Sequence, residues 1–273
     1  MARAQEPEEP SASGSLNYAF ATQLGSGIYS VNGRTAQIYR ITVSPQIRSS
    51  EESWGLRLRL PLTFGFYDFK LEDVIEKGLP DRLGTLAFVP TAEFEFHARR
   101  EWWLLPFAGM GLGKDFSGGE FNFIFALGAR SLAIFPFKRS DLRLGNRLVY
   151  TGYTSDSLDF VDDFGMFETG LDWRRSLGFQ LRGHVVDGSL FGANYLYFVS
   201  PQLFRLAPEP IEMRTEWEFG FTLGFTEAWK VLGISMPRLG LSYRFGSGAE
   251  ALRFIIGDPF PIDSPRDRGP RVQ

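Results

Sequence analysis

The sequence contains no cysteine and only two histidines, His97 and His184, among its 273 residues. The absence of cysteine excludes a disulfide framework and a thiolate metal site, and two histidines leave little for zinc chemistry. No lysine- or arginine-rich run occurs and the formal net charge is −3, so nucleic acid is not expected as a partner. The longest apolar stretch, 121–137, is interrupted by Asn122 and Arg130. A bundle of transmembrane helices is therefore excluded, because each helix would need about 20 apolar residues.

Aromatic residues and glycine are abundant instead, with 27 phenylalanines and 30 glycines. This aromatic content also excludes a disordered chain. Apolar and polar residues alternate along most of the sequence. In the segment 55–67, for example, Leu56, Leu58 and Leu60 alternate with Arg57 and Arg59. Because successive side chains of a strand point to opposite faces, such a segment has one apolar face and one polar face.

Thirteen segments show this alternation with different strength. The clearest are 34–48, 55–67, 85–99, 212–225 and 237–246, and the weaker ones are 16–31, 102–115, 121–136, 142–153, 164–175, 177–186, 190–200 and 251–257. They are longer than the mean soluble strand of about 5–6 residues, and they suit the 9–11 residues or so that cross a bilayer at a tilt. Since bacterial single-chain barrels have an even number of strands, we expect 12 strands. One of the thirteen predicted strands is therefore wrong, and the weak pair 177–186 and 190–200 is the first suspect. A helical period is visible only at 71–78.

These patterns predict an all-β fold, an antiparallel transmembrane β-barrel of about 12 strands. An arginine that faces lipid at the bilayer midplane costs about 2–4 kcal/mol, so the charged face of each strand is expected to line the lumen. Tryptophans 54, 102, 103, 173 and 229 lie at or near predicted strand ends, as an aromatic girdle requires. The alternative is a soluble lipocalin-like ligand-binding barrel, which would have the opposite arrangement, apolar inside and charged outside.

If the charged faces look inward, adjacent strands bring opposite charges together. Arg57 and Arg59 would face Glu93 and Glu95, Arg143 and Arg147 would face Glu168 and Asp172, and Glu216 and Glu218 would face Arg238 and Arg244. Cross-strand pairs of this kind stabilise a sheet by about 0.2–1 kcal/mol each. Such ladders either neutralise the lumen or line a weakly selective aqueous channel. The residues predicted to line the lumen are Arg40, Arg57, Arg59, Glu93, Glu95, His97, Arg147, Glu168, Asp172, Glu216 and Arg244.

No catalytic constellation is recognisable in the sequence. Outer-membrane lipid hydrolases place a histidine and a serine two residues apart, on one strand face. Here His97 has Glu95 and Arg99 at those positions, and His184 has Arg182 and Val186. The sequence also lacks a nucleophile elbow, a Walker A loop and a His-Glu-x-x-His helix. We therefore predict a protein that is not an enzyme, with no catalytic, cofactor-binding or metal-binding residues; an outer-membrane lipid-modifying hydrolase is the alternative.

Short motifs along 16–260 resemble the solitary outer-membrane autotransporter-like β-barrel family. They include Gly-Phe-Tyr-Asp-Phe at 65–69, Leu-Pro-Asp-Arg at 79–82, Leu-Gly-Asn-Arg-Leu at 144–148, Asn-Tyr-Leu-Tyr-Phe at 194–198 and Trp-Lys-Val-Leu-Gly at 229–233, with Pro-Phe at 259–260. The resemblance implies a barrel similar to an autotransporter translocator domain, without a passenger. The sequence itself shows no N-terminal helix of the kind that fills such a lumen. The resemblance implies no catalytic residues.

We therefore expect a polar leader at 1–15, a barrel at 16–260 and a polar tail at 261–273. The small-x-small triplet Ala2-Arg3-Ala4 has the form of a signal-peptide cleavage site, although the charged and apolar regions expected before it are missing. We expect processing near this point, and the alternative is a chance match, because such triplets are common. The predicted function is that of a structural or pore-forming, porin-like envelope protein of the Gram-negative outer membrane. Its expected partners are outer-membrane lipid and the assembly machinery, which would recognise an aromatic residue such as Phe260.

Overall fold

The structure is a computed structural model that describes residues 18–31, 34–49, 54–67, 84–99, 101–116, 121–155, 158–200, 213–226, 230–231, 234–247 and 249–259. Strands make up nearly all of this part of the chain, and the single described helix is α1 (Tyr18–Ala21). Within these residues no helix has the length and apolar character needed to span a bilayer. The predicted leader at 1–15, tail at 261–273 and helical stretch at 71–78 lie outside the described residues.

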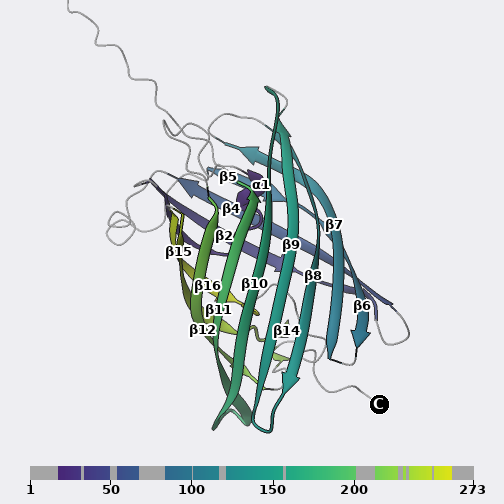
Figure 1. Cartoon of the computed structure of the whole chain (residues 1–273), viewed down its shortest axis with the longest axis vertical. Coiled ribbons are helices and arrows are strands. Elements are labelled where there is room, and N and C mark those ends of the chain that lie inside the picture. The colour runs from purple at the N-terminus through teal and green to yellow at the C-terminus, as the bar shows by residue number, and fades with distance from the viewer. Residues whose placement is uncertain are drawn as a thin grey trace, which may run out of the picture.

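The strands form one antiparallel sheet that closes on itself (Figure 1). Its strand segments are β1 (Gly27–Val31), β2 (Arg34–Val43), β3 (Gln46–Arg48), β4 (Trp54–Tyr67), β5 (Thr85–Phe88), β6 (Thr91–Arg99), β7 (Trp102–Asp115), β8 (Phe121–Pro136), β9 (Ser140–Ser155), β10 (Leu158–Leu181), β11 (His184–Val199), β12 (Thr215–Phe225), β15 (Leu239–Gly246) and β16 (Ala249–Ile256). Neighbours in sequence pair around the ring, β1 pairs with β16, and the pairing of β2 with β4 completes it. A separate two-stranded ribbon joins β13 (Lys230–Val231) to β14 (Ile234–Ser235).

The ring has 12 strand positions, as predicted. The segments β5 and β6 share one position between β4 and β7, and β2 and β3 share another beside β4. The predicted strand 177–186 is wrong. Residues 177–181 continue β10, Arg182 and Gly183 make a turn with φ of 51° and 83°, and β11 begins at His184. Sequence patterns identify a tight hairpin by Asn-Gly or Asp-Gly, whose residues readily adopt the left-handed conformation. Arg-Gly is not such a signal, so the turn was not predicted.

Apolar side chains cover the outside of the barrel, and the buried charged side chains lie inside. In β6, Phe94 and Phe96 are exposed, whereas Glu93 and Glu95 between them are fully buried. The other strands also expose apolar side chains, and their inward positions hold the remaining buried charges together with apolar clusters around α1 and on β7 and β8. An apolar outer face around a lumen that contains these charges excludes the lipocalin-like alternative and is typical of transmembrane barrels. The predicted girdle is only partly correct, because Trp102 is exposed at the start of β7 but Trp103 points inward and is buried. Trp229 lies outside the described residues.

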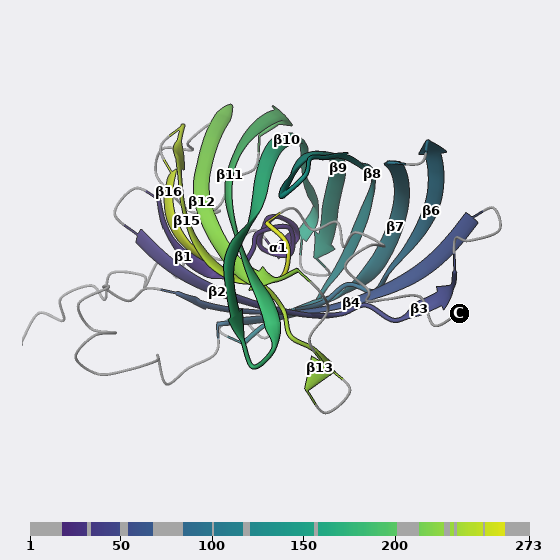
Figure 2. The ribbon, with the colours of Figure 1, turned by 90° about the horizontal axis from the view of Figure 1, so that it is seen from below.

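The chain enters the barrel before it forms the wall. Figure 2 looks along the barrel and shows α1 inside the ring of strands. We call the end where β9 reaches Ser155 the upper end, and the end with the Arg182–Gly183 turn the lower end. Phe20 of α1 packs edge-to-face on Phe164 with 5.2 Å between ring centroids, near the upper end. The expected strand at 16–31 therefore starts only at Gly27, and the expectation of no helix in the lumen is wrong.

Candidate functional site

The charged lumen is the candidate site, and Glu93 of β6 is the most heavily shared carboxylate in it. Its Oε1 atom lies 3.9 Å from an Nη1 atom of both Arg57 and Arg59, on the neighbouring strand β4. Its Oε2 atom accepts a hydrogen bond from Arg130 of β8, two strand positions away on the other side. Glu95 accepts a bond of 2.5 Å from Arg57. Three arginines therefore depend on Glu93 for part of their neutralisation.

Two further glutamates organise the opposite wall. Glu216 of β12 accepts hydrogen bonds from Arg244 of β15 and, at 2.6 Å, from the hydroxyl of Tyr197. Glu218, two residues further on, accepts bonds from Arg253 of β16, from Ser242 at 2.5 Å and from the Tyr195 hydroxyl at 2.6 Å. Alternation places both glutamates on the inner face of one strand, and a cation for each comes from β15, the neighbouring strand, and from β16, the strand beyond it. Each of these two glutamates is therefore paired with an arginine.

Ion pairs also join the walls near the lower end. Arg174 of β10 donates to Asp172 on its own strand and to Asp258, which follows β16, both at 2.5 Å. Arg143 of β9 lies 2.6 Å from Asp141 and 3.9 Å from the same Asp258. Asp258 thereby connects the last described residues of the chain to strands on the far side of the ring. Ion pairs therefore connect strands across the lumen as well as strands that are adjacent in the sheet.

The structure brings most of the predicted lumen residues together. Arg57, Arg59, Glu93, Glu95, Arg147, Glu168, Asp172, Glu216 and Arg244 are buried, Arg40 is half-buried, and His97 is exposed at the end of β6, beside the Trp103 ring. The predicted pairs of Arg57 with Glu95 and of Arg244 with Glu216 form, and Arg147 lies 3.4 Å from Glu168.

Other predicted pairs are replaced. Arg238 pairs with Asp187 of β11 rather than with Glu216 or Glu218, and Glu218 takes Arg253. Arg130, Arg253 and the two inward tyrosines, Tyr195 and Tyr197, were not among the predicted site residues. The signal was present for Arg130, because it occupies an inward position in the alternation of β8.

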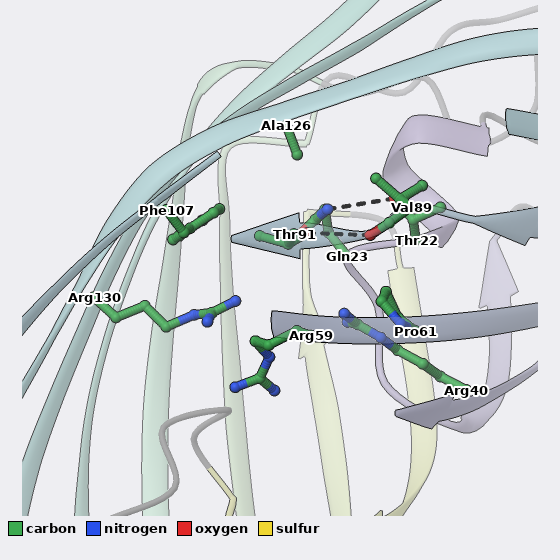
Figure 3. A pocket seen from close by; sticks show the side chains of 10 residues that line it. All are labelled: Thr22, Gln23, Arg40, Arg59, Pro61, Val89, Thr91, Phe107, Ala126 and Arg130. Atoms are coloured by element: carbon green, nitrogen blue, oxygen red, sulfur yellow. Dashed lines mark hydrogen bonds between the residues drawn. The ribbon is translucent and has the colours of Figure 1, made fainter. Parts of the chain in front are cut away.

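A small cavity lies in the middle of the lumen, next to the residues that follow α1. Figure 3 shows Arg40, Arg59 and Arg130 reaching towards one space from three different strands. Its volume is about 10 Å³, room for roughly one water molecule. The other lining residues are Thr22, Gln23, Pro61, Val89, Thr91, Phe107 and Ala126.

The uncharged polar side chains of the cavity wall already form hydrogen bonds to other groups. Gln23 donates to Thr22 and its Oε1 accepts a bond of 2.5 Å from Arg147, while Thr91 donates to the Val89 carbonyl. The Arg130 guanidinium carbon lies 4.4 Å from the centroid of the Phe107 ring, in a cation–π contact. The arginines are therefore the groups that present donors to the cavity.

The described residues do not gather their metal-binding side chains or their histidines at one point. No group of three or more metal-binding side chains occurs among them. The imidazoles of His97 and His184 contact the rings of Trp103 and Phe225, 5.7 and 6.2 Å between centroids, on different strands. The geometry therefore provides charge, hydrogen bonds and volume exclusion.

An apolar exterior around a filled, charged interior defines a β-barrel of the outer-membrane type. No protein-family model and no curated protein matches the chain, so the resemblance to the autotransporter-like family gains no support from the comparisons. Among solved structures the chain is similar to LpxR from Salmonella typhimurium, with 9% identity and a TM-score of 0.40, covering 85% of this chain and 90% of LpxR.

The comparison corrects one expectation. We predicted a protein that is not an enzyme, and the structure that the comparison returned, LpxR, is an outer-membrane lipid-modifying enzyme. The expectation is therefore withdrawn. LpxR corresponds to the alternative that the sequence left open rather than to a pore. A likeness at this level carries no argument about the chemistry of the present chain.

Proposed function

We propose that the protein is an outer-membrane barrel with a sealed lumen, similar in build to an autotransporter translocator without a passenger. In this role it is a structural envelope component and not a constitutively open pore. The supporting observation is that the lumen is filled at two levels. An apolar cluster around α1 occupies the upper part, and cross-lumen ion pairs occupy the part below.

The upper level is built from side chains of the wall and of the N-terminal segment. Phe20, Ala21 and Leu24 are buried against inward residues such as Ile124 and Phe164. The Phe20 ring also lies 6.0 Å from the Tyr197 ring. Burying a phenylalanine in this way stabilises the closed position by about 1.5–3 kcal/mol. The helix is thus held in the lumen by packing.

The lower level resists opening for an electrostatic reason. Glu93, Arg57, Arg130 and Glu218 are almost completely buried, and separating a buried ion pair costs about 3–5 kcal/mol when one charge is left without its partner. A permanent water-filled path of porin width would require many of these pairs to separate at once. The apolar outer face, in turn, matches the hydrocarbon of a bilayer and supports outer-membrane lipid as the surrounding partner.

Single-channel recording tests the proposal. The folded protein is first identified by its gel mobility with and without boiling, since a folded barrel migrates differently from the unfolded chain. It is then inserted into planar bilayers under a salt gradient. We expect a flat baseline, whereas steady porin-like conductance steps from the folded protein would overturn the sealed lumen.

Lipid analysis distinguishes the alternative, a lipid-modifying enzyme. Outer-membrane lipids from cells that express the native protein, the His97→Ala variant or an empty vector are compared by mass spectrometry. A structural barrel leaves the three lipid profiles the same. A mass change that requires the native protein would replace the structural role with an enzymatic one, and its loss in His97→Ala would point to that side chain.

A further inference from the structure

We propose that the cavity between Arg40, Arg59 and Arg130 is a binding site for a small monovalent anion of the size of chloride. The three guanidiniums come from β2, β4 and β8 and converge on one space (Figure 3). β2 and β4 are neighbours and β8 lies further round the ring, so positive charge reaches the same point from two parts of the wall. The inference does not depend on whether the lumen is sealed.

The charge around the cavity is unbalanced. Three guanidiniums line the cavity, those of Arg40, Arg59 and Arg130, and no acidic side chain is among the described lining residues. Within the described residues no ion pair joins Arg40 to an acidic side chain. Like charges close together in a buried space repel one another, and a counter-ion relieves that repulsion.

Hydrogen-bonding capacity is also unused at the cavity. The Nε atoms of Arg40 and Arg130 are buried and have no hydrogen-bond partner within the described structure. A buried donor without a partner is costly, and donors of a guanidinium bind anions more strongly than neutral donors do. The remaining walls are partly apolar, including Pro61, Val89 and Phe107, and they offer no competing negative group. An anion is thus the ligand that the wall chemistry favours.

The small size of the cavity favours a small anion. About 10 Å³ is room for roughly one water molecule, and among common anions a chloride ion is only somewhat larger. A tetrahedral oxyanion such as phosphate or sulfate would have to push the guanidiniums or Phe107 aside. Interiors are close-packed, so such a displacement is unfavourable. We therefore assign the site to a halide-sized ion.

Chloride-35 nuclear magnetic resonance tests the assignment on the full chain in neutral detergent. A bound chloride in exchange with bulk broadens the chloride line, so the native protein is expected to add linewidth and bromide to remove it by competition. Phosphate and sulfate at matched ionic strength are expected to displace chloride less than bromide does. Stronger displacement by phosphate would overturn the size argument.

Variants separate the cavity from the protein surface. Arg40→Gln is expected to lower chloride affinity about tenfold or more, because a charge-assisted hydrogen bond is lost. Arg40→Lys, which keeps the charge, is expected to retain part of the affinity. Arg175→Gln removes an exposed arginine at the lower part of β10 and is the matched control. Folding of each variant is verified by the boiling-dependent gel shift. Equal broadening by the native protein and Arg40→Gln, or an equal loss in Arg175→Gln, would overturn the site.

Discussion

Replacing Glu93 by glutamine tests whether ion pairs hold the lumen together. The change keeps the size of the side chain but removes a fully buried charge that three arginines share. Leaving a buried charge without its partner costs about 3–5 kcal/mol, and here Arg57, Arg59 and Arg130 all lose a counter-charge. Because these contributions are not additive, we expect the free energy of unfolding to fall by the upper part of that range and not by three times as much.

Urea-induced unfolding in detergent or liposomes, monitored by tryptophan fluorescence and by the boiling-dependent gel shift, measures this difference. The matched control is Glu250→Gln in β16, where the side chain is exposed. Exposed ion pairs contribute about 1 kcal/mol or less, so the control is expected to stay within that amount of the native protein.

A double-mutant cycle sharpens the test. Arg130→Gln removes the arginine that donates to Glu93 Oε2, and the double variant removes both partners. For side chains in direct contact we expect a coupling energy of about 0.5–3 kcal/mol. The reasoning is refuted if Glu93→Gln costs no more than Glu250→Gln, or if the cycle gives no coupling.

Three further predictions concern the packing of α1 inside the barrel, the outer face of the barrel and the close approach of two strands in its wall. Phe20→Ala removes the ring that packs on Phe164, which we expect to cost about 3–5 kcal/mol in urea-induced unfolding, while planar bilayers stay silent because the ion pairs below remain; native stability would contradict the packing role of the ring. Leu127→Arg on the outer face of β8 is expected to reduce the free energy of folding into liposomes by about 2–4 kcal/mol. The control Leu181→Arg, at a strand end, should cost only about 0–1 kcal/mol. Equal costs would argue against a lipid-facing surface. Gly111→Ala would place a Cβ atom 1.9 Å from the Phe88 carbonyl oxygen, whereas Gly113→Ala meets first a flexible Ile124 methyl at 3.1 Å. Only the first should abolish the folded band in the gel assay; its retention would show that the wall relaxes.

The faces of the strands follow from alternation alone. Phe94 and Phe96 lie outside and Glu93 and Glu95 inside because successive residues of a strand point to opposite faces, whatever the rest of the fold does. The contacts of Arg57 and Arg59 with those glutamates were predictable for the same reason, since β4 and β6 are neighbours both in the sequence order of strands and in the sheet.

The failures arise where sequence order does not determine proximity. Alternation does not indicate the register between neighbouring strands. That register determines that Arg238 pairs with Asp187 and that Arg253 pairs with Glu218. Alternation also has no signal for a one-turn helix such as α1, whose four residues are too few for a period of 3.6. The turn at Arg182 was missed because its conformation is unusual for the residue that adopts it.

The sequence by itself therefore determined the all-β class and the composition of the two faces, because each depends on a period of two residues within a strand. The number of strands also required the rule that such barrels have an even number. Only the tertiary structure decided that α1 enters the lumen, that Asp258 joins opposite walls and that Arg40, Arg59 and Arg130 meet at one cavity. Those contacts require the ring to close with a particular offset between strands. Closure brings together residues that are distant along the chain and on separate strands, which no local pattern encodes.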